Sequence, residues 1–157
     1  FKPDITPESV SSIKIRRTQR NIYKKLDAVV IDEISMVRAD LLDCVDAFLR
    51  RHGPKADTPF GGVQMIFFGD LYQLPPVVQH HDRGLFTDVY AGPYFFHAKS
   101  FQDLKIQILE LEKIYRQKEE DFIRLLGFIR TKSVTEEHLS FLNKRVLPDF
   151  EPKDDEF

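Results

Sequence analysis

Residues 26–33 read Leu26-Asp27-Ala28-Val29-Val30-Ile31-Asp32-Glu33, a short β-branched apolar run that ends in two acids. Such a run is typical of a strand that is buried on both faces of a sheet. Residues 63–68, Val-Gln-Met-Ile-Phe-Phe, predict a second buried strand that ends in Gly69-Asp70. Residues 105–111, Lys-Ile-Gln-Ile-Leu-Glu-Leu, alternate between polar and apolar side chains and predict a third strand.

Helical patterns separate and follow these strands. A long helix is expected after Ser35, its candidate N-cap, and before Gly53-Pro54, which stop it. Its apolar stripe is Val37, Leu41, Leu42, Val45, Phe48 and Leu49, with Asp40, Asp43 and Asp46 mostly on the other side. Further helices are expected over residues 16–25, 119–131 and 135–146, the last with a capping box of Ser133 and Glu136. Strands that alternate with helices predict an α/β fold with a mainly parallel sheet and C-terminal helices.

Composition narrows the class of protein. The 157 residues suit one domain and part of a second, and 42% hydrophobic with 31% charged residues excludes a disordered or fibrous chain. The net charge of -2 gives no overall basic field for nucleic acid, so the cations of residues 16–25 are expected to form a solvated helix face. The single cysteine, Cys44, excludes an internal disulfide and is expected to be buried. No membrane span or signal peptide is expected, and an intracellular location fits, which means cytoplasm or nucleoid in a bacterium and nucleus or mitochondrion in a eukaryote.

Polar side chains stand at the carboxyl ends of the predicted strands, where open α/β sheets bind ligands. Asp32 and Glu33 could divide two tasks, because one carboxylate can hold Mg²⁺ through water while the other orients an attacking water. The alternative is a strand that ends in a solvated acidic turn. After the second strand, Gln73 offers both a donor and an acceptor to a terminal phosphate, and Pro75-Pro76 stiffen the adjoining backbone. The alternative there is a proline-rich surface turn.

Arg116 comes after the third predicted strand, within Tyr115-Arg116-Gln117. An arginine at that place can clamp a phosphoryl group, although a solvated side chain is the favoured interpretation when Arg116 is considered alone.

Together these segments are far more specific than any one of them. Asp32-Glu33-Ile34-Ser35-Met36, Gly69-Asp70-x-x-Gln73-Leu74-Pro75-Pro76-Val77 and Tyr115-Arg116-Gln117 resemble motifs II, III and IV of the Pif/RecD branch of superfamily-one DNA helicases. The likeness to the Pif-type family extends over residues 1–146, and includes Arg38-Ala39-Asp40-Leu41-Leu42, Phe60-Gly61-Gly62-Val63-Gln64 and residues 122–130. It implies a partial RecA-like domain of the P-loop NTPase class over residues 1–117, a helical segment over 118–148 and a disordered tail over 149–157.

The resemblance also implies residue roles. Asp32 would hold Mg²⁺ through water, Glu33 would activate the attacking water, Gln73 would contact the γ-phosphate of ATP, and Arg116 would act as an arginine finger. Such helicases hydrolyse ATP to move 5′ to 3′ along single-stranded DNA and to unwind duplex junctions, in DNA repair, recombination and telomere maintenance. Tyr72, Pro75 and Pro76 are the candidate contacts to nucleic acid.

One part of the family pattern is missing from the sequence. It contains no Gly-x-x-x-x-Gly-Lys-Ser/Thr, the loop that cradles the phosphates, so we expect a slice of a longer helicase that is inactive by itself. The strand of that loop would lie between residues 63–68 and 105–111, and we therefore expect these two strands to close onto each other, or another chain to fill the gap by strand-mediated self-association.

Two other functions compete with a helicase fragment. The chain could be a separate, non-catalytic relative that binds DNA or a partner. It could also be a metal-dependent nuclease that uses Asp32, Glu33 and Asp70, which would cleave DNA with Mg²⁺ and without ATP. The Gly-Asp-x-x-Gln-Leu-Pro-Pro stretch argues against the nuclease.

Overall fold

The structure is a computed structural model that describes residues 6–10, 12–102, 104–115 and 118–148. Its residues fall into two compact units, Phe1–Ile108 and Leu109–Phe157. The first unit contains α1 (Pro7–Val10), α2 (Arg17–Lys24), β1 (Ala28–Ile31), the 3-10 turn η1 (Ile34–Met36), α3 (Ala39–His52), η2 (Pro59–Gly62), β2 (Gln64–Phe67), η3 (His80–Asp82), α4 (Arg83–Asp88), η4 (Phe95–His97) and α5 (Lys99–Gln102). The second unit contains α6 (Glu120–Arg130) and α7 (Glu136–Asn143). The expected domain division at residues 117 and 118 stays a prediction.

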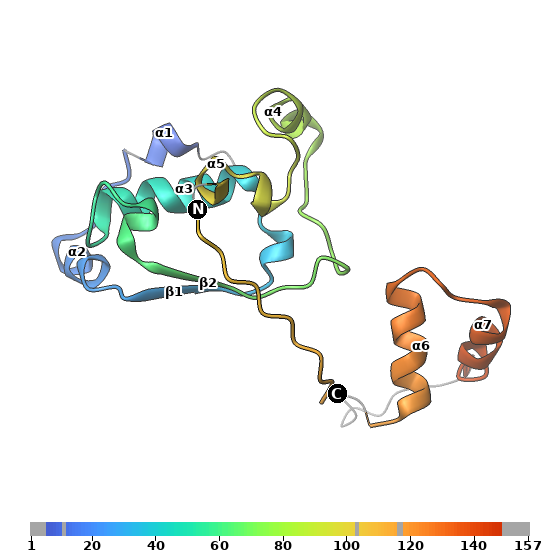
Figure 1. The fold of residues 1–157 in the computed structure, drawn as a ribbon. Coiled ribbons are helices and arrows are strands. Elements are labelled where there is room, and N and C mark those ends of the chain that lie inside the picture. The colour runs from blue at the N-terminus through green and yellow to red at the C-terminus, as the bar shows by residue number, and fades with distance from the viewer. Residues whose placement is uncertain (1–5, 11, 103, 116–117, 149–157) are drawn as a thin grey trace. The chain divides into compact units, whose positions relative to one another are not determined.

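β1 and β2 form a parallel pair in which Ala28 lies opposite Gln64 and Ile31 opposite Phe67. Parallel neighbours need a crossover, and α3 supplies it along one face of the pair (Figure 1). The core lies between α3, its flanking segments and that face of the sheet. It is formed by Ala39, Leu42, Leu49, Phe60, Val63, Phe86, Tyr90 and Ala98. The predicted α/β class and the parallel pairing of the first two strands are confirmed.

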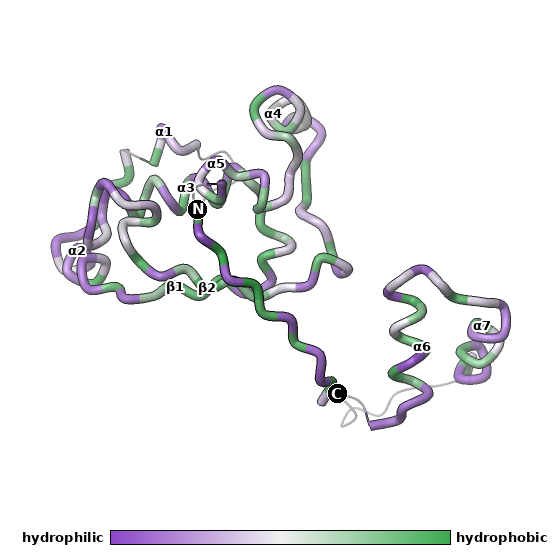
Figure 2. The backbone as a smooth tube through the Cα atoms, viewed as in Figure 1, coloured by the Kyte–Doolittle hydropathy of each residue, from purple (hydrophilic) through white to green (hydrophobic). Residues whose placement is uncertain are grey.

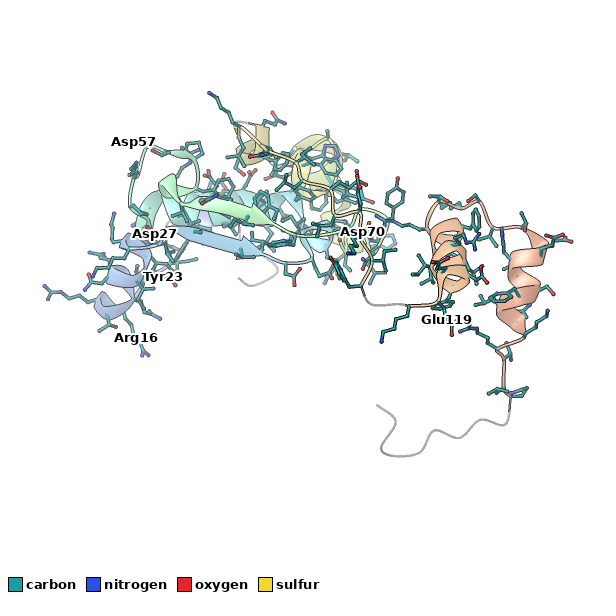
Figure 3. All side chains as sticks on the ribbon, turned by 60° about the horizontal axis from the view of Figure 1, so that its bottom comes forward. Arg16, Tyr23, Asp27, Asp57, Asp70 and Glu119 are labelled. Atoms are coloured by element: carbon teal, nitrogen blue, oxygen red, sulfur yellow. The ribbon has the colours of Figure 1, made fainter. Side chains whose placement is uncertain are left out.

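The expectation that these strands are buried on both faces is wrong. Val29 and Ile31 pack against the core, whereas Val30 points away from it and is 58% exposed. Figure 3 turns the lower side of Figure 1 forward, and there the strands lie in front of α3. The described helices of the first unit cover one face only, which leaves Val30 exposed on the other face.

The third predicted strand, residues 105–111, is not a strand among the described residues. Figure 2 shows the alternation of hydrophilic and hydrophobic residues along it, but it pairs with neither β1 nor β2 and Ile108 is 86% exposed. Alternating hydrophilic and hydrophobic residues determine which side chains would face the core of a sheet, but they supply no hydrogen-bond partner for the backbone. The expectation that residues 63–68 and 105–111 close onto each other is therefore wrong.

The N-caps of two helices differ from expectation. α3 begins at Ala39 with Arg38 as N-cap, because Ser35 is buried in the separate turn η1. α7 is capped by Thr135, whose Oγ1 accepts from the backbone N–H of His138 at 3.4 Å, and not by Ser133. The backbone N–H of Ser133 instead donates to the carbonyl of Phe128 at the end of α6.

Within the second unit, the ring of Phe128 on α6 stacks on His138 of α7 at a centroid distance of 4.3 Å. Arg145 reaches back to Glu119 at 2.8 Å. Across both units, none of the helices that the structure describes is both long enough and apolar enough to span a membrane.

Candidate nucleotide site at the strand ends

Two backbone hydrogen bonds join the segments just beyond β1 and β2. The N–H of Phe68 donates to the carbonyl of Ile31 at 2.9 Å, and the N–H of Ile34 donates to the carbonyl of Phe68 at 2.8 Å. The pairing thus continues past the strands, and it places Asp32-Glu33 beside Gly69-Asp70. Figure 3 labels Asp70 at this end of the sheet and Asp27 at the opposite end.

Gly69 permits this close approach. A Cβ at residue 69 would lie 2.9 Å from Cγ2 of Ile34 and 3.1 Å from its backbone nitrogen. Contacts below about 3 Å are repulsive between such atoms, so a side chain at residue 69 would push the two strand ends apart.

The backbone turns sharply at the two carboxylates. Glu33 has a left-handed conformation, with φ 50° and ψ 44°, and its N–H donates to Oδ1 of Asp32 at 2.9 Å. A non-glycine residue in that region costs on the order of 1–3 kcal/mol, and such strain clusters at functional sites. Both acids are exposed, in a position to meet a ligand from solvent.

The donor set fits Mg²⁺ held largely by other ligands. Among the described residues there is no group of three or more His, Cys, Asp or Glu that could surround a metal ion. Mg²⁺ is commonly bound by one or two carboxylates together with waters and substrate phosphates, and Asp32 with Glu33 can provide that protein share.

The segment after β2 is organised by Asp70. Its Oδ1 accepts from the backbone N–H of Tyr72 at 3.0 Å, and its Oδ2 accepts from Nε2 of Gln73 at 3.3 Å. The N–H of Gln73 donates to the Asp70 carbonyl at 3.0 Å, which closes the turn. Asp70 therefore orients both Gln73 and Tyr72, a positioning role that the sequence did not reveal.

The three candidate contacts to nucleic acid differ in their exposure to solvent. Tyr72 is 67% exposed and Pro75 is also exposed. Pro76 is buried and offers no surface to a strand, so its predicted contact with nucleic acid is not supported by the structure. Pro76 instead packs into the protein beside the exposed Pro75.

Asp32, Glu33, Asp70 and Gln73 thus all lie in the segments just beyond β1 and β2, within the first unit. Arg116 lies outside the described residues, as does the predicted tail over residues 149–157. Its neighbour Tyr115 is described and lies in the second unit.

A second polar arrangement was missed because its residues were assigned to the outer side of α3. Asp43 is only 7% exposed, and its carboxylate accepts from Tyr90 Oη at 2.9 Å, from the N–H of Ser100 at 2.8 Å and from the N–H of Lys99 at 3.3 Å. Burial and this carboxylate raise the pKa of the Tyr90 hydroxyl. Asp43 therefore tethers α5 and the segment that follows α4 to α3, which is a structural role.

Asp40 and Asp46, on either side of Asp43 in α3, also accept hydrogen bonds from residues outside this helix. Arg38 bridges Asp40 and Asp82 at 2.6 Å each, and the two carboxylates raise the pKa of its guanidinium. Oδ1 of Asp46 accepts from the N–H of Phe60 at 2.6 Å. The only signal in the sequence is the spacing of three residues, which places the three acids on neighbouring turns of one helix.

Cys44 is buried, as expected. Burial raises the pKa of its thiol to about 12, which keeps it protonated and unreactive near neutral pH.

Comparison with known proteins gives a consistent result. The family model described as PIF1-like helicase matches residues 2–136. The ATP-dependent DNA helicase PIF1 of Saccharomyces cerevisiae (strain YJM789) is 35% identical over 143 residues, which is 88% of this chain and 16% of the relative. The protein of the same name from Homo sapiens is 39% identical over 109 residues, or 69% of this chain and 16% of the relative.

Solved structures show the same likeness. A Bacteroides Pif1 helicase in complex with ADP-AlF3 and ssDNA superposes with a TM-score of 0.83 at 40% identity, over 91% of this chain and 33% of that one. The Pif1 helicase of Candida albicans superposes with a TM-score of 0.76 at 26% identity, over 96% of this chain and 32% of that one. The chain thus spans about a sixth of the length of these curated relatives and about a third of the solved chains.

Proposed function

Because the chain belongs to the family of PIF1-like helicases, we propose that its strand ends supply part of the ATP site of a longer ATP-dependent DNA helicase. The observation that carries this proposal is the hydrogen bond from Ile34 N–H to the Phe68 carbonyl, which holds Asp32-Glu33 against Gly69-Asp70. A coverage of 16% of the curated relatives is in accord with a part of a larger enzyme.

Each side chain then has a distinct task. Asp32 holds Mg²⁺ through water, and the ion supplies charge neutralisation at the phosphates. Glu33 accepts a hydrogen bond from the attacking water and takes up its proton. The amide of Gln73 donates to the terminal phosphate or accepts from the attacking water, and Arg116 adds positive charge where the transferred phosphoryl group becomes more negative.

The hydrogen bonds of Asp70 suggest how this site communicates with DNA. Its carboxylate holds both the Gln73 amide and the backbone N–H of Tyr72. A shift of Gln73 upon loss of the γ-phosphate would therefore alter the turn that presents Tyr72, whose exposed ring can stack on a base. This link would convert hydrolysis into a change of grip on single-stranded DNA.

The 157-residue chain by itself is proposed to be inactive. The sequence holds no phosphate-cradling glycine loop and lysine, and nothing among the described residues replaces these donors. Support for ATP and DNA as ligands comes from relatives that were solved with ADP-AlF3 and ssDNA, and at forked dsDNA.

The direct test compares the chain with the complete protein that contains it. ATP hydrolysis and unwinding are measured on partial duplexes with a 5′ or a 3′ single-stranded tail. We expect no turnover by the chain, and ATP-dependent unwinding of the 5′-tailed substrate only by the complete protein. A complete protein that binds the tail but neither hydrolyses ATP nor unwinds would instead support a non-catalytic DNA-binding relative.

A further inference from the structure

A positively charged hollow lies between α2 and α3. It has a volume of about 360 Å³ and is lined by Arg20, Lys24, Arg51 and His52. α2 leads into the amino end of β1, so this hollow is at the end of the unit where Asp27 lies, opposite Asp70 (Figure 3). It is therefore separate from the candidate nucleotide site.

His52 is the unusual member of the four. It is only 6% exposed, its ring packs on Phe48 at a centroid distance of 4.7 Å, and its Nε2 has no hydrogen-bond partner among the described residues. Burial, with the charges of Arg51, Arg20 and Lys24, lowers the pKa of His52, so its ring is neutral near pH 7. An unpartnered buried ring nitrogen is unfavourable, and a ligand that forms a hydrogen bond with it would remove that penalty.

Structural roles account for only part of this charge. Nζ of Lys24 donates to the Gly53 carbonyl at 2.7 Å and so closes the end of α3. Arg51 stands in the last turn of α3, where a cation favours the helix dipole. Neither role explains Arg20, and within the described ranges Arg20 and Arg51 have no acidic partner.

We propose that this hollow binds a phosphate group of a nucleic-acid backbone. Arginine and lysine donors that converge on one point suit a phosphate, and a ring N–H of His52 adds a donor. Arg17, Arg20 and Lys24 are spaced by three and four residues, so a line of cations runs along α2 into the hollow. A line of cations can bind successive phosphates of a nucleic-acid backbone, whereas a free phosphate would contact only the side chains of the hollow. The cations of residues 16–25, expected as a solvated face, gain a function in this way.

The test measures binding of a labelled oligothymidylate to the full 157-residue chain by fluorescence anisotropy at several KCl concentrations. The double variant R20E/R51E is compared with K105E/K132E, which makes the same charge change at exposed lysines outside the hollow. We expect R20E/R51E to weaken binding by about tenfold or more, and to flatten the slope of log affinity against log salt by about 0.7, the value for one lost phosphate contact on a single strand. Equal losses in both double variants would overturn the proposal.

A second experiment at His52 distinguishes a nucleic-acid phosphate from a free phosphate. NMR resonances of the His52 ring are followed while oligothymidylate or inorganic phosphate is added at constant ionic strength, with His138 of the second unit as internal control. We expect the His52 signals to move with the oligonucleotide, at phosphate-group concentrations where inorganic phosphate has no effect. An equal shift with inorganic phosphate would overturn the assignment to nucleic acid, and no shift with either would overturn the site.

Discussion

Gly69 is the residue on which the geometry of the candidate site depends most directly. Its missing side chain lets the ends of β1 and β2 meet, since a Cβ would lie 2.9 Å from Ile34 Cγ2. We expect Gly69→Ala to lower the free energy of unfolding by about 1–3 kcal/mol, as overpacking does. Urea unfolding measures this. Gly127→Ala is the control, because a Cβ there meets nothing within 4 Å on helix α6, and it should stabilise by about 0.5–1 kcal/mol. Equal effects of the two changes would contradict the account.

His52 should make the stability depend on pH in the mildly acidic range. Its folded pKa is lowered from the ordinary value by burial and by Arg51, Arg20 and Lys24. The unfolded chain therefore binds a proton near pH 6.5 that the folded chain does not, and the contribution of this residue is complete above that pH and declines below it. We expect the free energy of unfolding to fall between about pH 7 and pH 5, and His52→Gln to reduce that fall. An unchanged pH slope in His52→Gln would show that the ring is not held neutral.

At the scale of elements, α3 joins the parts of the first unit through its row of three aspartates. Asp43 alone accepts from Tyr90, Ser100 and Lys99 in a buried position. Asp43→Asn should cost about 1–3 kcal/mol of unfolding free energy, because the amide leaves buried donors without an acceptor. Asp121→Asn breaks only an exposed pair with Arg124 and should cost less than about 1 kcal/mol. Thermal or urea unfolding that ranks the two variants equally would refute the tethering role of α3.

The helices and strands show which parts of the fold can be predicted from the sequence. Two apolar runs, at residues 26–31 and 63–68, predict β1 and β2 because their side chains must be buried against other apolar side chains. The helix α3 follows β1 in the chain, and its apolar stripe packs on one face of the two strands. Residues 105–111 have the alternation of a strand but no neighbour to pair with, which no local pattern can reveal. The N-caps of α3 and α7 differ from expectation because Ser35 is buried in η1, and because Oγ1 of Thr135 accepts from the backbone N–H of His138 in the first turn of α7.

The candidate site was predictable to a similar degree. Parallel strands share their carboxyl edge, so Asp32-Glu33 and Gly69-Asp70 were expected at the same edge of the sheet, and the backbone hydrogen bonds of Phe68 to Ile31 and Ile34 bring the two segments together there. The hydrogen bonds that Asp70 makes to Gln73 and Tyr72 depend on the conformation of one turn, which the sequence does not specify. The burial of Asp43 likewise depends on where α4 and α5 fold back, a matter of long-range packing.

At the scale of the whole molecule, the first unit leaves apolar surface without cover. Val30 and Phe68 are exposed on or beside the sheet, and Ile108 is exposed in the segment that was expected to pair. A two-stranded sheet is marginal without further strands or covering elements. The solved relatives, of which the chain spans about a third, are long enough to supply such elements.

Asp32 and Glu33 are assigned to an ATP-hydrolysing site, and the roles proposed for Gln73 and Arg116 depend on that assignment. Glu33 is exposed on a strained turn directly beside Asp32, and its side chain is not part of the core. Glu33→Gln keeps the size of the side chain and removes the charge that takes up a proton from water. The folding of the variant should therefore be unchanged.

The measurement is steady-state ATP hydrolysis and nucleotide affinity of the complete protein that contains this chain, with and without Glu33→Gln. We expect hydrolysis to fall by about 10²–10⁴-fold while nucleotide affinity stays close to that of the unmodified protein, because Asp32 still holds Mg²⁺. Glu136→Gln, an exposed acid in the first turn of α7, should leave both quantities unchanged. Near-normal turnover in Glu33→Gln would contradict the assignment of this strand end to ATP hydrolysis.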